Sequence, residues 1–189
     1  MSKNEGFFKR ATGIAIDQQQ GELFVADTLR DKIYVMDLEG HVLREFGSRG
    51  SGPGEFNFPT ELVLHGNELL VVDAMNFRVQ ILDRQGHFLS QLGEAGDEAG
   101  RVFRPKGLSV DSEGNIYMVD ALLEAVQVFS RDGTLLYAFG RSGGGPGEFQ
   151  LPSGLWIDSN DRVYVADSYN QRVQTFQFIS AKRAAGDRR

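Results

Sequence analysis

The sequence contains no cysteine, only five prolines and one tryptophan, and no long uninterrupted run of apolar residues. Without cysteine the chain cannot form disulfides, use a thiol in catalysis or hold a metal through sulfur. No apolar run reaches the roughly 18 residues that a membrane-spanning helix needs, and the opening MSKNEGFFKR lacks the apolar core of a signal peptide. We therefore expect a soluble chain that carries no export signal in this sequence. Its compartment stays open.

A basic excess is also missing, because 26 acidic residues against 20 lysines and arginines give a formal net charge of −6. Proteins that bind nucleic acid usually carry a basic footprint, so this balance argues against a nucleic acid as the partner. Helical periodicity is absent as well, since no apolar 3.6-residue repeat persists along the chain. Glycine, in contrast, is abundant at 23 residues, which suits a fold of many short strands and tight turns.

Two glycine-rich segments are nearly identical: GSGPGEFNFP begins at Gly50, and GGGPGEFQLP begins at Gly143, 93 positions later. Neither contains the pattern of a phosphate-binding loop, and a strand-like run rather than a helix follows each. A degenerate copy, DEAGRVFRP, begins at Asp97, about halfway between them. The segments therefore indicate an internal repeat, in which Phe56 and Phe149 are predicted to plug the space between successive units.

Other residues recur with the same period. Four aspartates close strand-like runs at spacings of 46, 47 and 47 residues: Asp27, Asp73, Asp120 and Asp167. Each complete unit holds four short runs rich in branched and aromatic side chains, separated by turns, and a repeated meander of this length is typical of a β-propeller blade. We predict an all-β chain, a β-propeller of about four antiparallel four-stranded blades with approximate bounds of 5–47, 48–93, 94–140 and 141–178.

The segments VADSYNQRVQTF (165–176) and VVDAMNFRVQIL (71–82), together with the GPGEF loops, resemble the NHL repeat. The resemblance covers roughly residues 5–178 and implies a six-bladed ring. The fourth unit stops after its third strand, so the sequence supplies about four blades. We expect a fragment of a larger propeller, an open arc, or a protomer closed by association, with self-association through the open terminal blades. The polar, basic residues 179–189 are expected to be disordered.

Because the four aspartates recur in every unit, we predict that they maintain the blade rather than bind a metal. Each is expected to accept hydrogen bonds from the loop that follows it and to pair with the basic residue five positions later, which is Lys32, Arg78 or Arg172. In the third unit Ala125 stands in place of the basic residue, so Asp120 is expected to lack that partner.

Candidate binding residues lie on the expected upper face, where the second and third strands of each blade connect through TLRDK, AMNFR, ALLEA and SYNQR. The predicted ligand- or partner-binding residues on these loops are Arg30, Met75, Asn76, Phe77, Leu122, Leu123, Tyr169 and Asn170. Glu61, which stands where the other units have glycine, and Lys106 are predicted to flank the channel entrance. Exposed apolar groups ringed by polar ones are typical interface anchors. The alternatives are side chains folded back onto the neighbouring blade and simple solvation of Glu61 and Lys106.

No catalytic residue, metal site or cofactor is predicted. The only histidines are His41, His65 and His87. His41 and His87 are equivalent residues just after hairpin glycines and are expected on the outer strands, whereas His65 lies at a turn, so the three should not converge on one zinc. No nucleophile-and-base motif is present. The leading interpretation is a non-enzymatic NHL-type scaffold that binds a protein or peptide. The alternatives are a metal-dependent hydrolase or lyase completed by further blades or a second chain, and an RNA-binding domain.

Overall fold

The computed structural model describes residues 6–177 as four antiparallel sheets. Blade 1 contains β1 (Ala11–Asp17), β2 (Glu22–Asp27), β3 (Lys32–Asp37) and β4 (Val42–Phe46). Blade 2 contains β5 (Pro59–His65), β6 (Glu68–Asp73), the 3₁₀ turn η1 (Ala74–Asn76), β7 (Arg78–Asp83) and β8 (Phe88–Leu92). Blade 3 contains β9 (Pro105–Val110), β10 (Ile116–Asp120), β11 (Ala125–Phe129) and β12 (Leu135–Phe139). Blade 4 contains β13 (Gly154–Ile157), β14 (Arg162–Asp167) and β15 (Arg172–Gln177).

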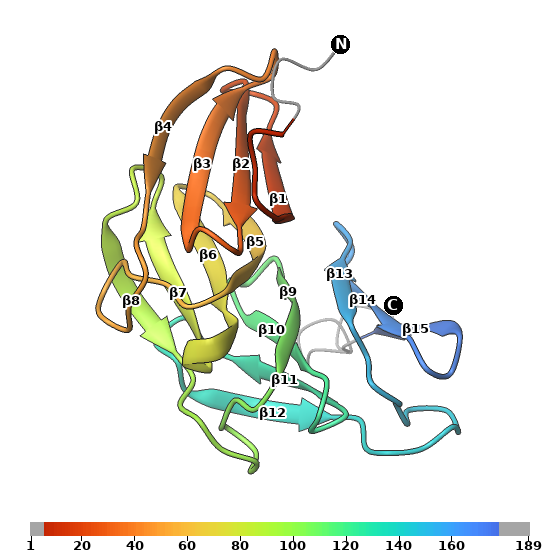
Figure 1. The fold of residues 1–189 in the computed structure, drawn as a ribbon. Coiled ribbons are helices and arrows are strands. Elements are labelled where there is room, and N and C mark those ends of the chain that lie inside the picture. Colours follow the sequence, from red (N-terminus) through yellow and green to blue (C-terminus); the bar gives the residue numbers. More distant parts are fainter. Residues whose placement is uncertain (1–5, 178–189) are drawn as a thin grey trace.

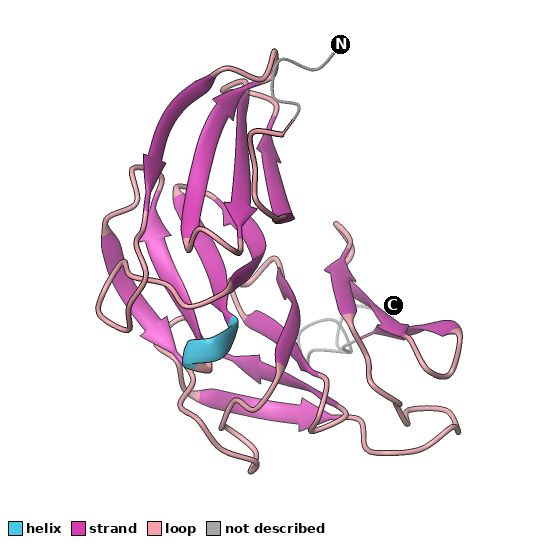
Figure 2. Cartoon of the chain, in the orientation of Figure 1, coloured by secondary structure: helices cyan, strands magenta, loops and turns pink. Residues whose placement is uncertain are grey.

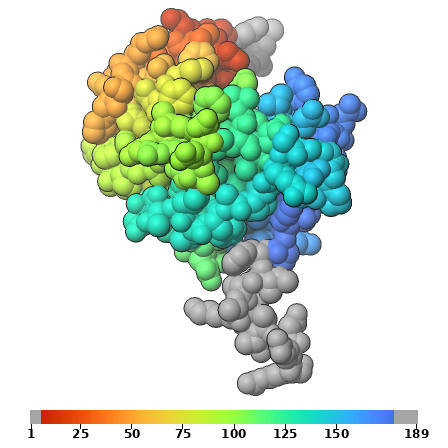
Figure 3. Space-filling model, turned by 90° about the horizontal axis from the view of Figure 1, so that it is seen from below, coloured from red at the N-terminus to blue at the C-terminus, as the bar shows by residue number. Residues whose placement is uncertain are grey.

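The four blades stand side by side in an arc (Figure 1). Strands pair in sequence order within each sheet, and the inner strand of each blade contacts that of the next, from β1 to β5, β9 and β13. Among the described residues, no strand pair joins β13 back to β1. Apart from η1, residues 6–177 form only strands and loops (Figure 2). The view from below shows the segments following one another around the molecule in sequence order (Figure 3). The predicted all-β propeller is confirmed.

The hydrophobic core lies between the blades rather than within them. Side chains of β2 and β3 in blade 1 pack against side chains of β5, β6 and β7 in blade 2, and the two later junctions are built in the same way. Phe56 and Phe149 are fully buried in the first and third of these clusters, as the repeat predicted, and Val102 takes the same place at the second. Since each cluster needs both of its blades, neighbouring blades stabilise each other.

Hairpin glycines also contribute to the blade junctions. Gly40, Gly86 and Gly133 have φ of 89°, 92° and 87°, the left-handed region that their turns require. A β-carbon on Gly86 would lie 2.3 Å from Cγ of Phe46. The turn of blade 2 therefore packs directly on the outer strand of blade 1, so glycine is needed there for space as well as for φ.

The two end blades differ in what covers them. Phe7 and Phe8 pack edge-on against Tyr34, with ring centroids 5.1 and 5.6 Å away, and so cover part of the free face of blade 1. On blade 4, Trp156 and Val173 are 61% and 65% exposed. The tail at 179–189 lies outside the described residues. Within the described part of the chain, no helix is both long and apolar enough to span a membrane.

Candidate functional site on the upper loop face

Two loops of each blade meet on the upper face: the loop that enters the inner strand and the loop that joins the second strand to the third. In three blades the same backbone hydrogen bond links them, from the N–H of the first residue after the second strand to the carbonyl of the residue before the inner strand. The pairs are Thr28 to Arg10 at 3.0 Å, Ala74 to Phe58 at 3.2 Å and Ala121 to Arg104 at 2.9 Å. This bond fixes the height of both loops above the sheet.

The four repeated aspartates hold these loops in place. All four are fully buried: Asp27, Asp73, Asp120 and Asp167. Their carboxylates accept backbone N–H groups mainly from the loop that enters the blade, for example from Asn57 to Asp73 at 2.7 Å. The sequence had predicted donors in the loop that follows each aspartate. Among the described residues, backbone N–H donors from that loop occur only at Asp120, which accepts from Leu122 and Leu123 at 3.1 and 3.2 Å. The aspartates therefore build the blade.

The expected ion pairs are present in two blades. Arg78 donates to Asp73 and Arg172 to Asp167, each at 2.8 Å. The pair predicted for Lys32 is wrong: Lys32 bonds Glu45 on β4. A lysine has one compact ammonium and takes the nearer carboxylate, whereas the arginine fork reaches the aspartate and the loop carbonyls together.

Arginine and glutamine together clamp the glycine-rich loops, a role that the sequence interpretation missed. Arg78 donates to the carbonyls of Ser51, Gly52 and Glu55 at 2.9–3.0 Å. Gln80 donates to the Glu55 carbonyl at 2.6 Å and accepts the N–H of Gly54 at 2.9 Å. Gln127 and Gln174 make the same pair of bonds in blades 3 and 4. The recurrence of R-V-Q in the sequence was the feature from which this clamp could have been predicted.

Several predicted binding residues have bonds within the blade. Asn76 donates to the Gly50 carbonyl and to Asp73, both at 2.8 Å, and Asn170 bonds its own loop and aspartate in the same way. Arg30 lies 3.6 Å from Asp27 and 5.4 Å from the Phe7 ring centroid. These three side chains are thus occupied by structural contacts.

The apolar candidates separate into two groups. Met75, Leu122 and Tyr169 are 54%, 45% and 66% exposed at equivalent places on three loops. Leu123 and Phe77 are half-buried, and Phe77 packs against the core between blades 2 and 3. Phe77 also has φ of 55°, in the left-handed region that a bulky residue seldom adopts.

A cavity of about 390 Å³, here called the upper pocket, opens between the loops of blades 1, 2 and 3. Its cationic residues are Arg10, Arg104 and Lys106. None of these forms an ion pair with another residue of 6–177, and in the same range this is true of only one other lysine or arginine, Lys9. No acidic side chain lines the pocket. The upper pocket therefore gathers unneutralised positive charge on an acidic chain.

Three threonines and four apolar side chains form the rest of the lining that bears on ligand binding: Thr12, Thr28, Thr60, Phe58, Met75, Phe77 and Phe103. Thr12 and Thr28 share a hydrogen bond of 2.6 Å, and Thr28 donates to the Pro59 carbonyl at 2.7 Å. The Thr60 hydroxyl is buried and has no hydrogen-bond partner among the described residues. Arg10 lies 6.0 Å from the Phe58 ring centroid.

Of the upper-pocket residues, the sequence interpretation named Met75, Phe77 and Lys106 but missed Arg10, Arg104 and Thr60. Arg10 and Arg104 come just before the inner strands β1 and β9, and the repeat places Phe58 and Leu151 at the equivalent positions of blades 2 and 4. This alternation between arginine and an apolar residue at equivalent positions was the feature from which the cation cluster could have been predicted.

The second predicted entrance residue, Glu61, lines a channel of about 400 Å³ formed by the four inner strands. It has no charged or hydrogen-bonding partner among the described residues, and burial raises the pKa of its carboxyl. Glu61 therefore belongs to the lining of the channel and not to that of the upper pocket.

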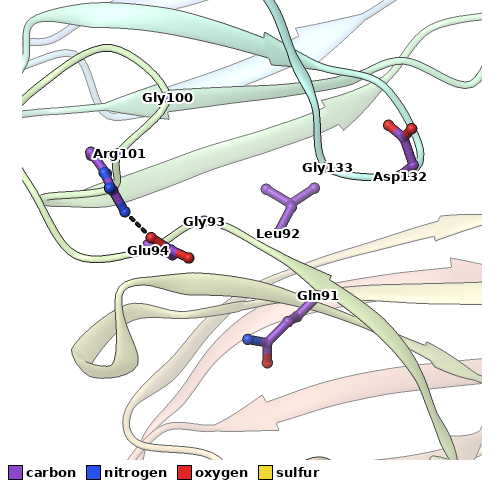
Figure 4. A pocket seen from close by; sticks show the side chains of 8 residues that line it. All are labelled: Gln91, Leu92, Gly93, Glu94, Gly100, Arg101, Asp132 and Gly133. Atoms are coloured by element: carbon purple, nitrogen blue, oxygen red, sulfur yellow. Dashed lines mark hydrogen bonds and ion pairs between the residues drawn. The ribbon is translucent and has the colours of Figure 1, made fainter.

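A third hollow, of about 260 Å³, lies at the outer edge between blades 2 and 3 (Figure 4). Its charged groups already have partners: Arg101 reaches Glu94, and Asp132 accepts the Ser130 hydroxyl. We therefore assign it to the packing of the two blades.

No group of three or more metal-ligating side chains is found in the part of the chain that the structure describes. His41 and His87 each bond the aspartate four residues before them, Asp37 and Asp83, at 2.7 and 2.8 Å. These pairs sit at the hairpin turns of the outer strands.

Residues 12–68 and 112–184 match the family described as 6-bladed beta-propeller, whereas no curated protein matches the chain. Among solved structures, a streptogramin B lyase is 14% identical over 90% of this chain and 55% of its own, with a TM-score of 0.65. A protein of unknown function from Bacteroides caccae is 17% identical over 90% of this chain and 58% of its own, with a TM-score of 0.66.

The WD40 beta propeller domain of Doa1 is 15% identical over 92% of this chain and 51% of its own, also with a TM-score of 0.66. The chain thus spans little more than half the length of these structures. At such identities the likeness shows the propeller fold alone.

Proposed function

The chain belongs to the 6-bladed beta-propeller family, and from this premise we propose that it is a non-enzymatic scaffold of the NHL type that binds a protein or peptide through its upper face. The observation that carries the proposal is the set of exposed apolar side chains on three equivalent loops, Met75, Leu122 and Tyr169. Large apolar groups next to polar loop atoms are the usual anchors of protein interfaces. The NHL-like R-V-Q and GPGEF segments add support, because they form the clamps that hold these loops.

A peptide library displayed on phage tests this function. Peptides selected on the intact chain are compared on two triple variants, one with Met75, Leu122 and Tyr169 replaced by serine, and one with Leu43, Leu89 and Leu136 replaced by serine. The second set is exposed on the outer strands β4, β8 and β12, so it removes similar apolar area from another face.

We expect the upper-face variant alone to lose binding, by at least about tenfold, because a hot-spot side chain contributes about 2 kcal/mol. Absence of any selected peptide, or equal loss in both variants, would show the proposal to be wrong.

Self-association through the arc ends is a separate proposal, supported by the exposed Trp156 and Val173 on blade 4 and by Ile14 and Ile16 on β1. Light scattering over a concentration series tests it. A discrete dimer that Trp156→Ser disrupts is the expected result, and a constant mass near 21.0 kDa would contradict it.

A further inference from the structure

We infer that the upper pocket binds a carboxylate of an acidic peptide segment, with an apolar side chain of the same segment against its aromatic wall. The inference rests on the proposed function and deepens it by naming the chemistry of the partner. It is carried by the convergence of three unpaired cations, one buried hydroxyl without a partner, and four large apolar side chains in one cavity of about 390 Å³.

Three unpaired cations line the upper pocket. Arg10 and Arg104 come from equivalent positions in blades 1 and 3, Arg10 lies 6.0 Å from the Phe58 ring centroid, and Lys106 is half-buried on β9. Like charges in one cavity repel each other, and partial burial of Lys106 strengthens the repulsion. Since every other lysine and arginine within residues 6–177 except Lys9 pairs with an acid, this cluster is complementary to an anion. A carboxylate can accept from an arginine fork through both oxygens.

Thr60 also lines the upper pocket. Its hydroxyl oxygen is buried, and no protein group among residues 6–177 forms a hydrogen bond with it. A buried hydroxyl without a partner destabilises the folded protein. Because the oxygen is shielded in this rotamer, the Thr60 side chain must turn about χ1 before the hydroxyl can donate a hydrogen bond to an oxyanion bound in the upper pocket. Thr12 and Thr28 bond each other and the Pro59 carbonyl, so they are less free to turn toward a ligand.

The apolar wall specifies the rest of the ligand. Phe58, Phe77 and Phe103 come from three different loops, and Met75 adds a flexible thioether beside them. Such a wall next to a cation cluster favours a segment in which an acidic residue is followed by an aromatic or aliphatic one. The cavity volume matches one or two side chains rather than a folded surface.

A peptide fits these observations better than a nucleic acid. A nucleic acid needs a continuous basic track along its phosphates. Among residues 6–177, three of the four unpaired cations lie in one cavity, and the chain carries a net charge of −6. An acidic side chain needs only the local cluster.

Fluorescence anisotropy with four labelled probes tests the inference: the hexapeptide Gly-Leu-Glu-Phe-Glu-Gly, its glutamine and lysine counterparts at the two acidic positions, and a ten-nucleotide oligouridylate. We expect the acidic peptide to bind about tenfold or more tightly than the glutamine peptide, with weakening at higher salt. The double variant Arg104→Gln/Lys106→Gln should remove this preference. Lys9→Gln, which removes an unpaired cation outside the pocket, is the matched control and should keep it.

Charge reversal keeps the test sharp if affinities are low. Arg104→Glu/Lys106→Glu should prefer the lysine peptide, an outcome that loss of folding cannot mimic. Equal binding of the acidic and glutamine peptides would overturn the inference and leave the proposed function standing. Tighter binding of oligouridylate would overturn the peptide assignment. Absence of binding by every probe would overturn the inference, while the phage selection reports separately on the proposed function.

Discussion

The junction between blades 1 and 2 and the junction between blades 2 and 3 use the same repeat but are closed to different degrees. At the first, Gly13 lies so close to β5 that a β-carbon would be 2.4 Å from the Thr60 carbonyl oxygen. At the second, Glu61 occupies the position equivalent to Gly13. The side chain fits only where the neighbouring inner strand stays farther away.

The two junctions also differ in the side chains that hold their loops. The loop entering blade 2 is clamped by Arg78, whereas Ala125 leaves the loop entering blade 3 with the glutamine clamp alone. Asp31 accepts the Phe58 N–H at 2.9 Å at the first junction, while Phe77 takes the position equivalent to Asp31 at the second. The second junction has thus lost a carboxylate and an arginine clamp, and the upper pocket opens beside it. We infer that relaxed blade closure provides room for a ligand.

The largest expected effect comes from the buried aspartates. Asp73→Ala leaves Arg78 buried without its carboxylate and should lower the free energy of unfolding by about 3–5 kcal/mol. Asp120→Ala leaves only backbone N–H groups without their acceptor and should lower the free energy of unfolding by about 1–3 kcal/mol. Urea denaturation of both variants measures the difference, and equal losses would contradict the contrast between the blades.

Glycine substitutions test how closely the inner strands approach. Gly13→Ala and Gly107→Ala would each place a β-carbon 2.4 Å from backbone of the next blade and should cost about 2 kcal/mol. Gly154→Ala is the matched control, because its β-carbon would meet the Ala166 β-carbon at an ordinary 3.5 Å. In thermal unfolding, Gly154→Ala should have a clearly higher Tm than the other two variants. A similar loss of Tm in all three would refute the steric explanation.

Restoring the missing clamp should hold the loop that enters blade 3 more firmly to that blade. Ala125→Arg places a guanidinium where Arg78 and Arg172 stand in blades 2 and 4, next to Asp120. We expect about 1 kcal/mol of added stability by urea denaturation. Ala125→Lys is the control and should add less, since Lys32 at the equivalent place in blade 1 does not reach its aspartate. A gain from lysine as large as that from arginine would rule out the clamp.

The smallest effect concerns Glu61. Burial raises the pKa of this carboxyl above its ordinary 4.5, so the folded protein binds more protons than the unfolded chain between the two pKa values. Stability contributed by the protonated form is present at low pH and falls as pH rises through the folded pKa. Glu61→Gln should therefore raise Tm by about 2 °C at pH 7 and leave it unchanged below pH 4.5. A constant difference across pH would contradict this origin.

The repeat made the fold predictable, because Asp, Gly and strand patterns recurring every 46 or 47 residues determine one blade and its neighbours together. It was less informative about the candidate site. Met75, Phe77 and Lys106 were recognisable as departures from the repeat, but Arg10 and Thr60 lie in different blades and meet only through packing. Lys32 was assigned to the wrong carboxylate because the rotamer of a long side chain depends on the adjacent strand, where Glu45 lies.

The clamp has a consequence for how such chains grow. Arg78 and Gln80 fasten the loop at residues 51–55 to the blade that follows it, and among the described residues no equivalent bond ties this loop to the blade before it. The structural repeat unit is therefore a glycine-rich loop together with the sheet that follows it, such as residues 48–93. It is not a sheet together with the loop that follows that sheet. A gene duplication or an engineered insertion cut at these boundaries would carry every clamping bond with it, whereas a cut four or five residues later would separate the loop from the side chains that shape it.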